Sequence, residues 1–396
     1  MRLLKWLKQN WIQNRISPYP PNRRKRYCLF RRLHSCNQLA ERKTYSPLTI
    51  LLKNPELYNG SKMHITSCFN YTCMLLKHYS ICLLLIFCLL APMFTQAQVE
   101  YPYPVQKFNI TLENKPVQIA YMDARPDSSI SSNMKTVMLF HGKNFNGYYW
   151  KDVMAFLVKA GFRVLVPDQP GWGRSDKPEL HYSFHLLSYA MNRLLDSLHI
   201  EKIYLVGHSM GGMLAARFSM LYPGKVEKLV LENPIGLEDY RRFVPYQTIE
   251  QLYENEIKAT YESYKKYQQG YYPQWKPEYE QYVQAQAEAL KSPEFPRIAR
   301  VNAITYQMIY EQPVCYEWDR ISAPTLLIIG TDDRTIVGKA LLSDEDKNKY
   351  GQYPALAKKT KEQLPNALLF EVPGVGHIPH VQDLGQFKQV LLTFLK

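Results

Sequence analysis

One short stretch constrains the fold of this 396-residue chain more than any other: an apolar strand that leads through Gly-x-Ser-x-Gly into a helix. The apolar residues 203–206 precede the motif, and a helical pattern follows it. In such a turn Gly207 and Gly211 let the backbones pass without Cβ clashes, while the hydroxyl of Ser209 projects from the strand end. The backbone N–H of Met210, at the helix start, can then face a developing oxyanion.

The rest of the chain from about residue 105 alternates short apolar strands with helical stretches. This alternation favours a doubly wound, mainly parallel sheet covered by helices on both faces, the α/β class. Residues 108–112 and 117–122 predict a hairpin around Asn114-Lys115-Pro116. The other predicted strands are 136–140, 162–166, 202–206, 228–231, 325–329 and 368–372, and the predicted helices are 150–159, the stretch around Leu187, 213–221 and the stretch that closes the chain.

Residues 234–320 interrupt the alternation. They favour helix, are punctuated by prolines and hold 13 of the 30 tyrosines. We interpret the segment as an inserted helical cap, with 98–233 and 321–396 as the α/β core. The tyrosines either stiffen the cap or line a cleft between cap and sheet, and the sequence does not sort them.

Ser209 needs a base and an acid to act as a nucleophile. Asp332 and Asp333 follow the strand that ends at Gly330, and His377 follows the strand that ends near residue 372. The carboxyl ends of parallel strands share one edge, so these residues can converge. We expect Ser209 to attack a carbonyl, His377 to carry the proton, and the Asp to fix the imidazole.

A second oxyanion donor is expected from the loop after the strand 136–140. The sequence there is His141-Gly142-Lys143-Asn144, and the backbone N–H of Lys143 is the candidate. The side chains of Lys143 and Asn144 face either the site or the solvent.

Residues 105–396 resemble the α/β-hydrolase fold superfamily with a helical cap. The motifs that carry this resemblance are His141-Gly142, Asp168-Gln169-Pro170-Gly171-Trp172-Gly173-Arg174-Ser175, Gly207-His208-Ser209-Met210-Gly211-Gly212, Gly330-Thr331-Asp332-Asp333-Arg334 and Gly376-His377. The resemblance implies Ser209 as nucleophile, Asp333 as acid and His377 as base, and it implies an esterase, a carbon–carbon bond hydrolase or a related acyl hydrolase. Haloalkane dehalogenases and epoxide hydrolases of this superfamily have an aspartate as nucleophile. This chain has Ser209 at that position, which argues against both chemistries.

Other side chains compete for the acid and base roles. Asp332 is the neighbour of the expected acid, and Glu232, at the end of the preceding strand, occupies a place where some relatives keep theirs. His380 lies three residues past His377, and we expect it to be a neighbour of the site.

No metal or cofactor is expected. His377-x-x-His380 lacks a third ligand at metal-binding spacing, and no Gly-x-Gly-x-x-Gly lies between a strand and a helix. We expect His141 and His208 to support the site and residues 168–175 to form a tight loop near the cleft.

The first hundred residues differ in composition from the remainder. The chain has a net charge of +14, but residues 1–97 hold 15 of its 49 basic residues and two of its 35 acids, so the remainder is nearly neutral. The charge of residues 98–396 therefore gives no indication of a basic surface that would bind nucleic acid. The apolar run 81–93, with Lys77 before it and Ala97 after it, predicts a signal peptide over 74–97.

The basic extension 1–73 precedes that signal and is either translated upstream sequence or a genuine phosphate-contacting segment. We expect an exported protein, periplasmic or secreted, cleaved near Ala97. The alternative is an anchor over residues 81–94, although the run is short for a stable membrane span.

The combined prediction is a cofactor-independent serine hydrolase that cleaves an ester or similar acyl bond of a small molecule. The alternatives are carbon–carbon bond hydrolysis or acyl transfer on the same three residues, or a ligand-binding protein without turnover. The sequence gives no indication of the oligomeric state or of the identity of the substrate.

Overall fold

A single eight-stranded sheet organises the chain. The computed structural model describes residues 99–126 and 134–396, so the predicted extension 1–73 and signal peptide 74–97 lie outside the described residues. The strands are β1 (Val105–Leu112), β2 (Lys115–Ala124), β3 (Thr136–Phe140), β4 (Arg163–Pro167), β5 (Ile203–His208), β6 (Val226–Glu232), β7 (Thr325–Gly330) and β8 (Ala367–Val372).

The strand order across the sheet is β1-β2-β4-β3-β5-β6-β7-β8. β1 pairs antiparallel with β2 and β2 with β4, and every other neighbouring pair is parallel. The predicted class, a mainly parallel sheet, is confirmed.

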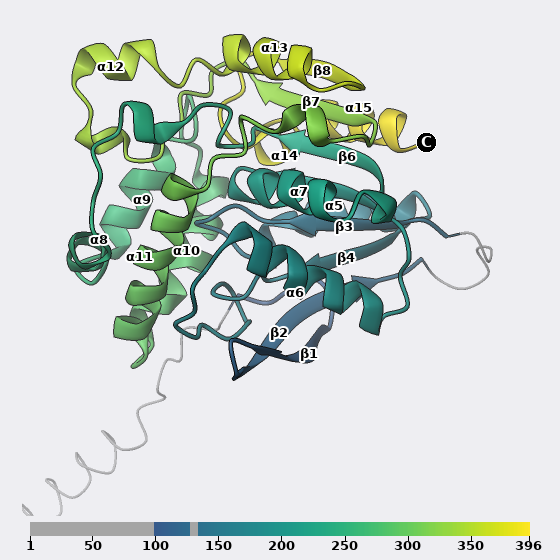
Figure 1. The fold of residues 1–396 in the computed structure, drawn as a ribbon, viewed down its shortest axis with the longest axis horizontal. Helices are drawn as coiled ribbons and strands as arrows, with labels where there is room; N and C mark the ends of the chain where they lie inside the picture. Colours follow the sequence, from purple (N-terminus) through teal and green to yellow (C-terminus); the bar gives the residue numbers. More distant parts are fainter. Residues whose placement is uncertain (1–98, 127–133) are drawn as a thin grey trace, which may run out of the picture. The chain divides into compact units, whose positions relative to one another are not determined.

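Helices cover both faces of the sheet (Figure 1). They are α5 (Lys151–Lys159), α6 (Phe184–Ser197), α7 (Met210–Leu221), α8 (Ile249–Glu256), α9 (Tyr261–Gln269), α10 (Glu280–Ala287), α11 (Phe295–Glu311), α12 (Asp344–Lys349), α13 (Tyr353–Gln363), α14 (Pro379–Gln382) and α15 (Leu384–Leu395). These are the α-helices within the part of the chain that the structure describes.

The alternation of side chains along β3 explains the two layers of core. Met138 and Phe140 face the cluster formed with α6, α7 and α13. Val137 and Leu139 face the cluster formed with α5 and α15. Since every residue of β3 is buried, the strand is apolar throughout, as expected of a parallel strand covered on both sides.

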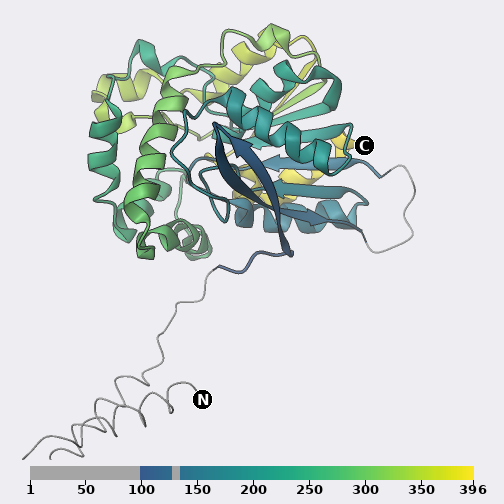
Figure 2. The same cartoon turned by 60° about the horizontal axis from the view of Figure 1, so that its bottom comes forward.

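The predicted hairpin is confirmed, but its turn lies earlier than expected. Glu113 and Asn114 both have positive φ, at 48° and 61°, and form the two-residue turn. Lys115 and Pro116 already belong to β2, where Pro116 faces Thr111 of β1. Figure 2 turns this hairpin towards the viewer.

The helices α8 to α11 are inserted between β6 and β7. They gather at one end of the sheet, at the left of Figure 1. Capping boxes begin α8 at Thr248 and α9 at Thr260, and Pro296 lies in the first turn of α11. The boundaries 234 and 320 of the cap remain a prediction.

In the part of the chain that the structure describes, no helix is both long and apolar enough to cross a membrane.

Candidate active site

Ser209 occupies a strained turn between β5 and α7. Its φ and ψ are 55° and −121°, which a residue other than glycine rarely adopts. A Cβ on Gly207 would lie 2.2 Å from the carbonyl oxygen of Gly211, and one on Gly211 would lie 2.2 Å from that of Phe140. Both glycines are therefore required by close backbone approach.

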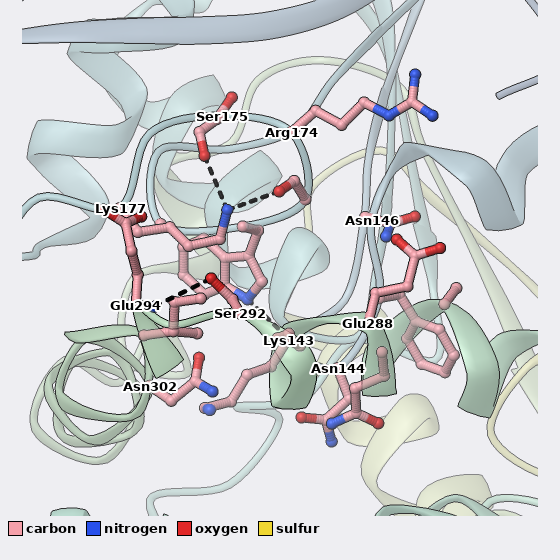
Figure 3. Close-up of a pocket in the computed structure, with 18 of the residues that line it drawn as sticks. Lys143, Asn144, Asn146, Arg174, Ser175, Lys177, Glu288, Ser292, Glu294 and Asn302 are labelled. Carbon is pink, nitrogen blue, oxygen red and sulfur yellow. Dashed lines mark hydrogen bonds between the residues drawn. The ribbon is translucent and has the colours of Figure 1, made fainter. Parts of the chain in front are cut away.

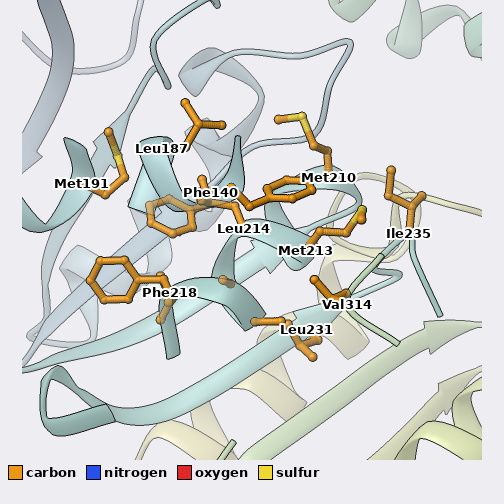
Figure 4. Packing of buried hydrophobic residues seen from close by; sticks show 14 of the residues in the cluster. Phe140, Leu187, Met191, Met210, Met213, Leu214, Phe218, Leu231, Ile235 and Val314 are labelled. Carbon is orange, nitrogen blue, oxygen red and sulfur yellow. The ribbon is translucent and has the colours of Figure 1, made fainter. Parts of the chain in front are cut away.

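The core beneath this turn is densely packed. Met210 and Met213 of α7 lie among the apolar side chains drawn in Figure 4, and the rings of Phe140 and Phe218 meet edge to face with centroids 6.2 Å apart. Such packing holds the start of α7, and with it the backbone N–H of Met210, in a fixed place next to Ser209.

The structure brings His377 within hydrogen-bond distance of both Ser209 and Asp333. The Oγ of Ser209 lies 2.9 Å from Nε2 of His377, and Nδ1 of His377 lies 2.7 Å from Oδ2 of Asp333. Ser209 follows β5, Asp333 follows β7 and His377 follows β8, all at the carboxyl edge of the sheet. Both members of the His–Asp pair are 1% exposed, while Ser209 is 6% exposed.

Asp333 is held by donors on both of its carboxylate oxygens. The side-chain amide of Asn233 donates to Oδ2 at 2.7 Å, and the backbone N–H of Thr335 donates to Oδ1 at 2.8 Å. Burial alone would raise the pKa of Asp333, but the imidazole of His377 and these hydrogen bonds lower the pKa below its ordinary value. Asp333 therefore stays ionised beside the imidazole.

The rival acids lie elsewhere. Asp332 is exposed, and its carboxylate accepts from the hydroxyl of Thr331. Glu232 is fully buried but binds His380 instead, accepting from its backbone N–H at 2.7 Å and from Nδ1 at 2.9 Å. His380 is thus a neighbour of the site that is engaged with a carboxylate of its own.

The loop 141–144 lies against Ser209. A Cβ on Gly142 would come 3.1 Å from the Cβ of Ser209. The Gly142 N–H donates to the Tyr149 hydroxyl at 3.0 Å, and the indole N–H of Trp172 donates to the carbonyl of Lys143 at 2.6 Å. These bonds fix the loop on both sides of the Lys143 backbone N–H.

The side chain of Lys143 lines a cavity of about 340 Å³ between this loop, the loop 171–177 and the helices α10 and α11 (Figure 3). Burial lowers the pKa of Lys143. Asn144, also on the cavity wall, donates from its side-chain amide to the hydroxyl of Tyr271 at 2.9 Å. The sequence left open whether the side chains of Lys143 and Asn144 face the interior or the solvent, and in the structure both face inward.

Tyr271, in the segment between α9 and α10, covers His377. The two rings are stacked at 26° with centroids 4.8 Å apart, and the Tyr271 carbonyl accepts the backbone N–H of His377 at 2.8 Å. Sequence reasoning could not single out this residue among the 13 tyrosines of its segment. Asn233 was also missed, although its place directly after β6, at the same sheet edge, was a usable signal.

The loop 168–175 is a tight turn organised by Asp168. Its buried carboxylate accepts from the backbone N–H groups of Gly147 and Arg174, both at 2.6 Å, and from the hydroxyl of Tyr101 at 2.8 Å. His141 is fully buried beside it, and burial lowers the pKa of His141. His141 links this loop to the loop 141–144, because the backbone N–H of Gln169 donates to its Nε2 at 3.2 Å.

Within residues 99–126 and 134–396, no three His, Cys, Asp or Glu side chains gather as potential metal ligands.

The chain is similar to known proteins of one family. Residues 135–384 match the family described as alpha/beta hydrolase fold. A 2-hydroxy-6-oxononadienedioate/2-hydroxy-6-oxononatrienedioate hydrolase from Paraburkholderia phymatum is 30% identical over 274 residues, covering 66% of this chain and 87% of that protein.

Two further similarities agree with this match. A 2-hydroxy-6-oxo-6-phenylhexa-2,4-dienoate hydrolase from Comamonas testosteroni is 29% identical over 51% of this chain and 72% of that protein. The crystal structure of a probable hydrolytic enzyme from Pseudomonas aeruginosa superposes with a TM-score of 0.73 and 40% identity, over 75% of this chain and 96% of that one. The chain therefore belongs to the α/β hydrolase fold family and is a hydrolase enzyme.

Proposed function

We propose that the enzyme is a serine hydrolase that cleaves an ester or similar acyl bond of a small molecule through an acyl-enzyme. The observation that carries the proposal is the buried hydrogen-bonded series from Ser209 through His377 to Asp333, at 2.9 Å and 2.7 Å. An ionised Asp333 can only accept, so Nδ1 of His377 carries the proton and Nε2 is free to accept the hydroxyl proton of Ser209.

The proposed reaction has two halves. Oγ of Ser209 attacks the substrate carbonyl as its proton passes to Nε2 of His377, and the backbone N–H groups of Met210 and Lys143 bind the resulting oxyanion. His377 returns the proton to the leaving group as the tetrahedral intermediate collapses to the acyl-enzyme. A water then gives a proton to His377 and attacks the acyl carbonyl, which releases the acid and restores Ser209.

The cavity that borders the loop 141–144, whose lining includes neither Ser209 nor His377, favours a small, polar ligand over a long aliphatic chain. Its wall carries Lys143, Asn144 and Asn302, all with polar groups, and its volume is about 340 Å³. Hydrophobic pockets bind alkyl chains through a continuous apolar lining, whereas the apolar side chains of this cavity, such as Phe145, Trp172 and Ile298, share its wall with charged and amide side chains.

Carbon–carbon bond hydrolysis is the second candidate, because two of the relatives are named as hydrolases of 2-hydroxy-6-oxo-dienoates or dienedioates. Acyl transfer on the same residues and ligand binding without turnover remain as further alternatives. Residues 74–97 are proposed to direct export, with cleavage near Ala97.

The test is a panel of p-nitrophenyl esters of increasing acyl chain length, assayed with the wild type, Ser209→Ala and a matched control, Ser219→Ala. Ser219 lies on the same helix, and its hydroxyl donates to the carbonyl of Ala215. We expect Ser209→Ala to lower turnover by a factor on the order of 10⁴ to 10⁶, and Ser219→Ala to leave it within about threefold. An unchanged rate in Ser209→Ala would eliminate the mechanism.

Product analysis separates the remaining alternatives. With a 2-hydroxy-6-oxo-dienoate as substrate, release of a dienoate and a free acid at a higher kcat/KM than for any ester would favour the carbon–carbon hydrolase. Formation of a new ester in the presence of a competing alcohol would identify acyl transfer.

A further inference from the structure

Three hydrogen bonds form a continuous series behind the candidate active site, from the backbone of Gly142 to the backbone of His377. The N–H of Gly142 lies 3.0 Å from the hydroxyl oxygen of Tyr149, and that oxygen lies 3.0 Å from Nδ1 of His208. Nε2 of His208 lies 2.8 Å from the carbonyl oxygen of His377. Tyr149 is 2% exposed and His208 is fully buried.

The hydrogen-bond partners determine which atom of this series carries each proton. A carbonyl oxygen only accepts, so Nε2 of His208 must carry a proton. Burial, with the neighbouring His377 and His380, lowers the pKa of His208 well below its ordinary value, so the ring is neutral and Nδ1 is bare. The Tyr149 hydroxyl therefore donates to Nδ1, and its oxygen accepts the N–H of Gly142.

Aromatic packing fixes the tyrosine in the middle of the series. Its ring is stacked on that of Phe145 at 10° with centroids 4.6 Å apart, and it meets His380 edge to face at 4.8 Å. The hydroxyl of Tyr149 therefore cannot move away from its two partners without displacing its neighbours.

We propose that Tyr149 and His208 are positioning residues, which hold the 142–143 loop and His377 at a fixed separation on either side of Ser209. This inference rests on the proposed function, in which Lys143 supplies an oxyanion N–H and His377 is the base. The Gly142 N–H is occupied by Tyr149, so the next amide along the loop, that of Lys143, is left for the substrate. The side-chain hydrogen bonds of Tyr149 and His208 go to each other and to the two backbone segments that they join, so both residues act through those segments.

The kinetic test uses the full chain with Tyr149→Phe, His208→Asn, the double variant and the control Tyr240→Phe. Tyr240 is another buried tyrosine whose hydroxyl accepts one backbone N–H, that of Gly236 at 3.1 Å. The readouts are kcat and KM for p-nitrophenyl acetate, the inhibition constant of phenylboronic acid, which forms a tetrahedral adduct with serine, and the unfolding midpoint.

We expect Tyr149→Phe to lower kcat about 10- to 100-fold with KM within about twofold, and to weaken the boronate by a similar factor. Tyr240→Phe should leave kcat and the inhibition constant of the boronate within about twofold, although it should lose about as much stability as Tyr149→Phe. Because the two residues act as a unit, the double variant should fall within about threefold of the poorer single variant. Unchanged boronate affinity in Tyr149→Phe, or losses that multiply in the double variant, would overturn the proposal.

A readout that needs no activity separates this inference from the proposed function. In the protein with ¹⁵N-labelled histidine, nitrogen NMR should find His208 neutral with its proton on Nε2, and Tyr149→Phe should shift the Nδ1 resonance. A proton on Nδ1 of His208 would refute the positioning series even in an active enzyme. The expected tautomer in a chain without any turnover would leave the series intact and contradict the proposed function.

Discussion

At the scale of single residues, two adjacent aspartates with the same chemistry have different environments. Asp333 is 1% exposed and receives hydrogen bonds from Asn233, Thr335 and His377, whereas Asp332 faces solvent. The difference follows from the loop after β7, which directs the first carboxylate outward and the next one to the interior.

Asp333→Asn should therefore lower kcat by a factor on the order of 10³ to 10⁴, because a neutral amide no longer enforces the tautomer of His377. Asp332→Asn is the matched control and should keep kcat within about twofold. Steady-state kinetics on an ester substrate measures both. A larger loss in Asp332→Asn than in Asp333→Asn would show that the acid has been misassigned.

The carboxylate of Glu238, which is half-buried, makes a pH-dependent contribution to stability. Burial raises the pKa of Glu238, whose carboxylate accepts the N–H of Gly351 at 2.9 Å. The pKa of Glu238 is higher in the folded than in the unfolded protein. The stability linked to this group is therefore fully present below its unfolded-state pKa, and it is lost as the pH rises through the folded-state pKa.

Glu238→Gln keeps an acceptor for Gly351 but cannot ionise. We expect the variant and the wild type to have similar free energies of unfolding near pH 4, and the variant to gain relative to the wild type as pH rises towards 7. Urea denaturation at several pH values measures the difference. A gap that narrows with rising pH would contradict the assigned direction of the shift.

At the scale of elements, the turn between β5 and α7 shows how sequence dictates geometry. Gly207 and Gly211 are needed because backbone atoms come within 2.2 Å of where a Cβ would stand. This close approach lets the strand and helix meet at Ser209 and allows α7 to begin at Met210.

Gly211→Ala should accordingly destabilise the fold by about 2 to 3 kcal/mol, because the added methyl group meets the carbonyl oxygens of Phe140 and His141. Gly224→Ala, at an exposed position with no atom within 4 Å, is the control and should change stability by less than about 0.5 kcal/mol. Urea denaturation gives both values. Equal stability of the two variants would mean that the turn relaxes.

The sequence predicted the elements that have strong periodicity and missed those that depend on contacts made elsewhere. Thr136–Phe140 was predicted to the residue, because a short, mostly apolar run that ends in His141-Gly142 is typical of a buried strand. The helices α12 and α13 were missed because they are polar and lie on the surface, with only Tyr353, Ala357 and Thr360 of α13 buried. The stacking of Tyr271 on His377 is a tertiary contact across more than a hundred residues, and local sequence carries no signal for it.

At the scale of the whole molecule, the basic charge and the described fold belong to different parts of the chain. Residues 1–97 hold nearly all of the excess positive charge, and the first described residue, Val99, is hydrogen-bonded to the body of the enzyme. There the carbonyl of Val99 accepts from the guanidinium of Arg174 at 2.7 Å, and the hydroxyl of Tyr101 donates to Asp168. The segment 99–101 therefore belongs to the enzyme.

A chain that starts at Gln98 should match the full chain in kcat/KM and in unfolding free energy, within about 0.5 kcal/mol. A chain that starts at Pro104 lacks the bonds of Val99 and Tyr101 and should lose about 1 to 2 kcal/mol. N-terminal sequencing of the native protein should find a start near Gln98. A native start before residue 74 would contradict the proposed export signal and support a genuine basic extension.

In the proposed mechanism, Ser209 is a nucleophile activated by His377. The most direct measurement is labelling of the folded protein with a fluorophosphonate, followed by mass spectrometry of the modified peptide, with His377→Gln as the comparison. We expect a single adduct on Ser209 that forms at least about 100-fold more slowly in His377→Gln. Failure to label the folded wild type, or an adduct on any other residue, would contradict this mechanism.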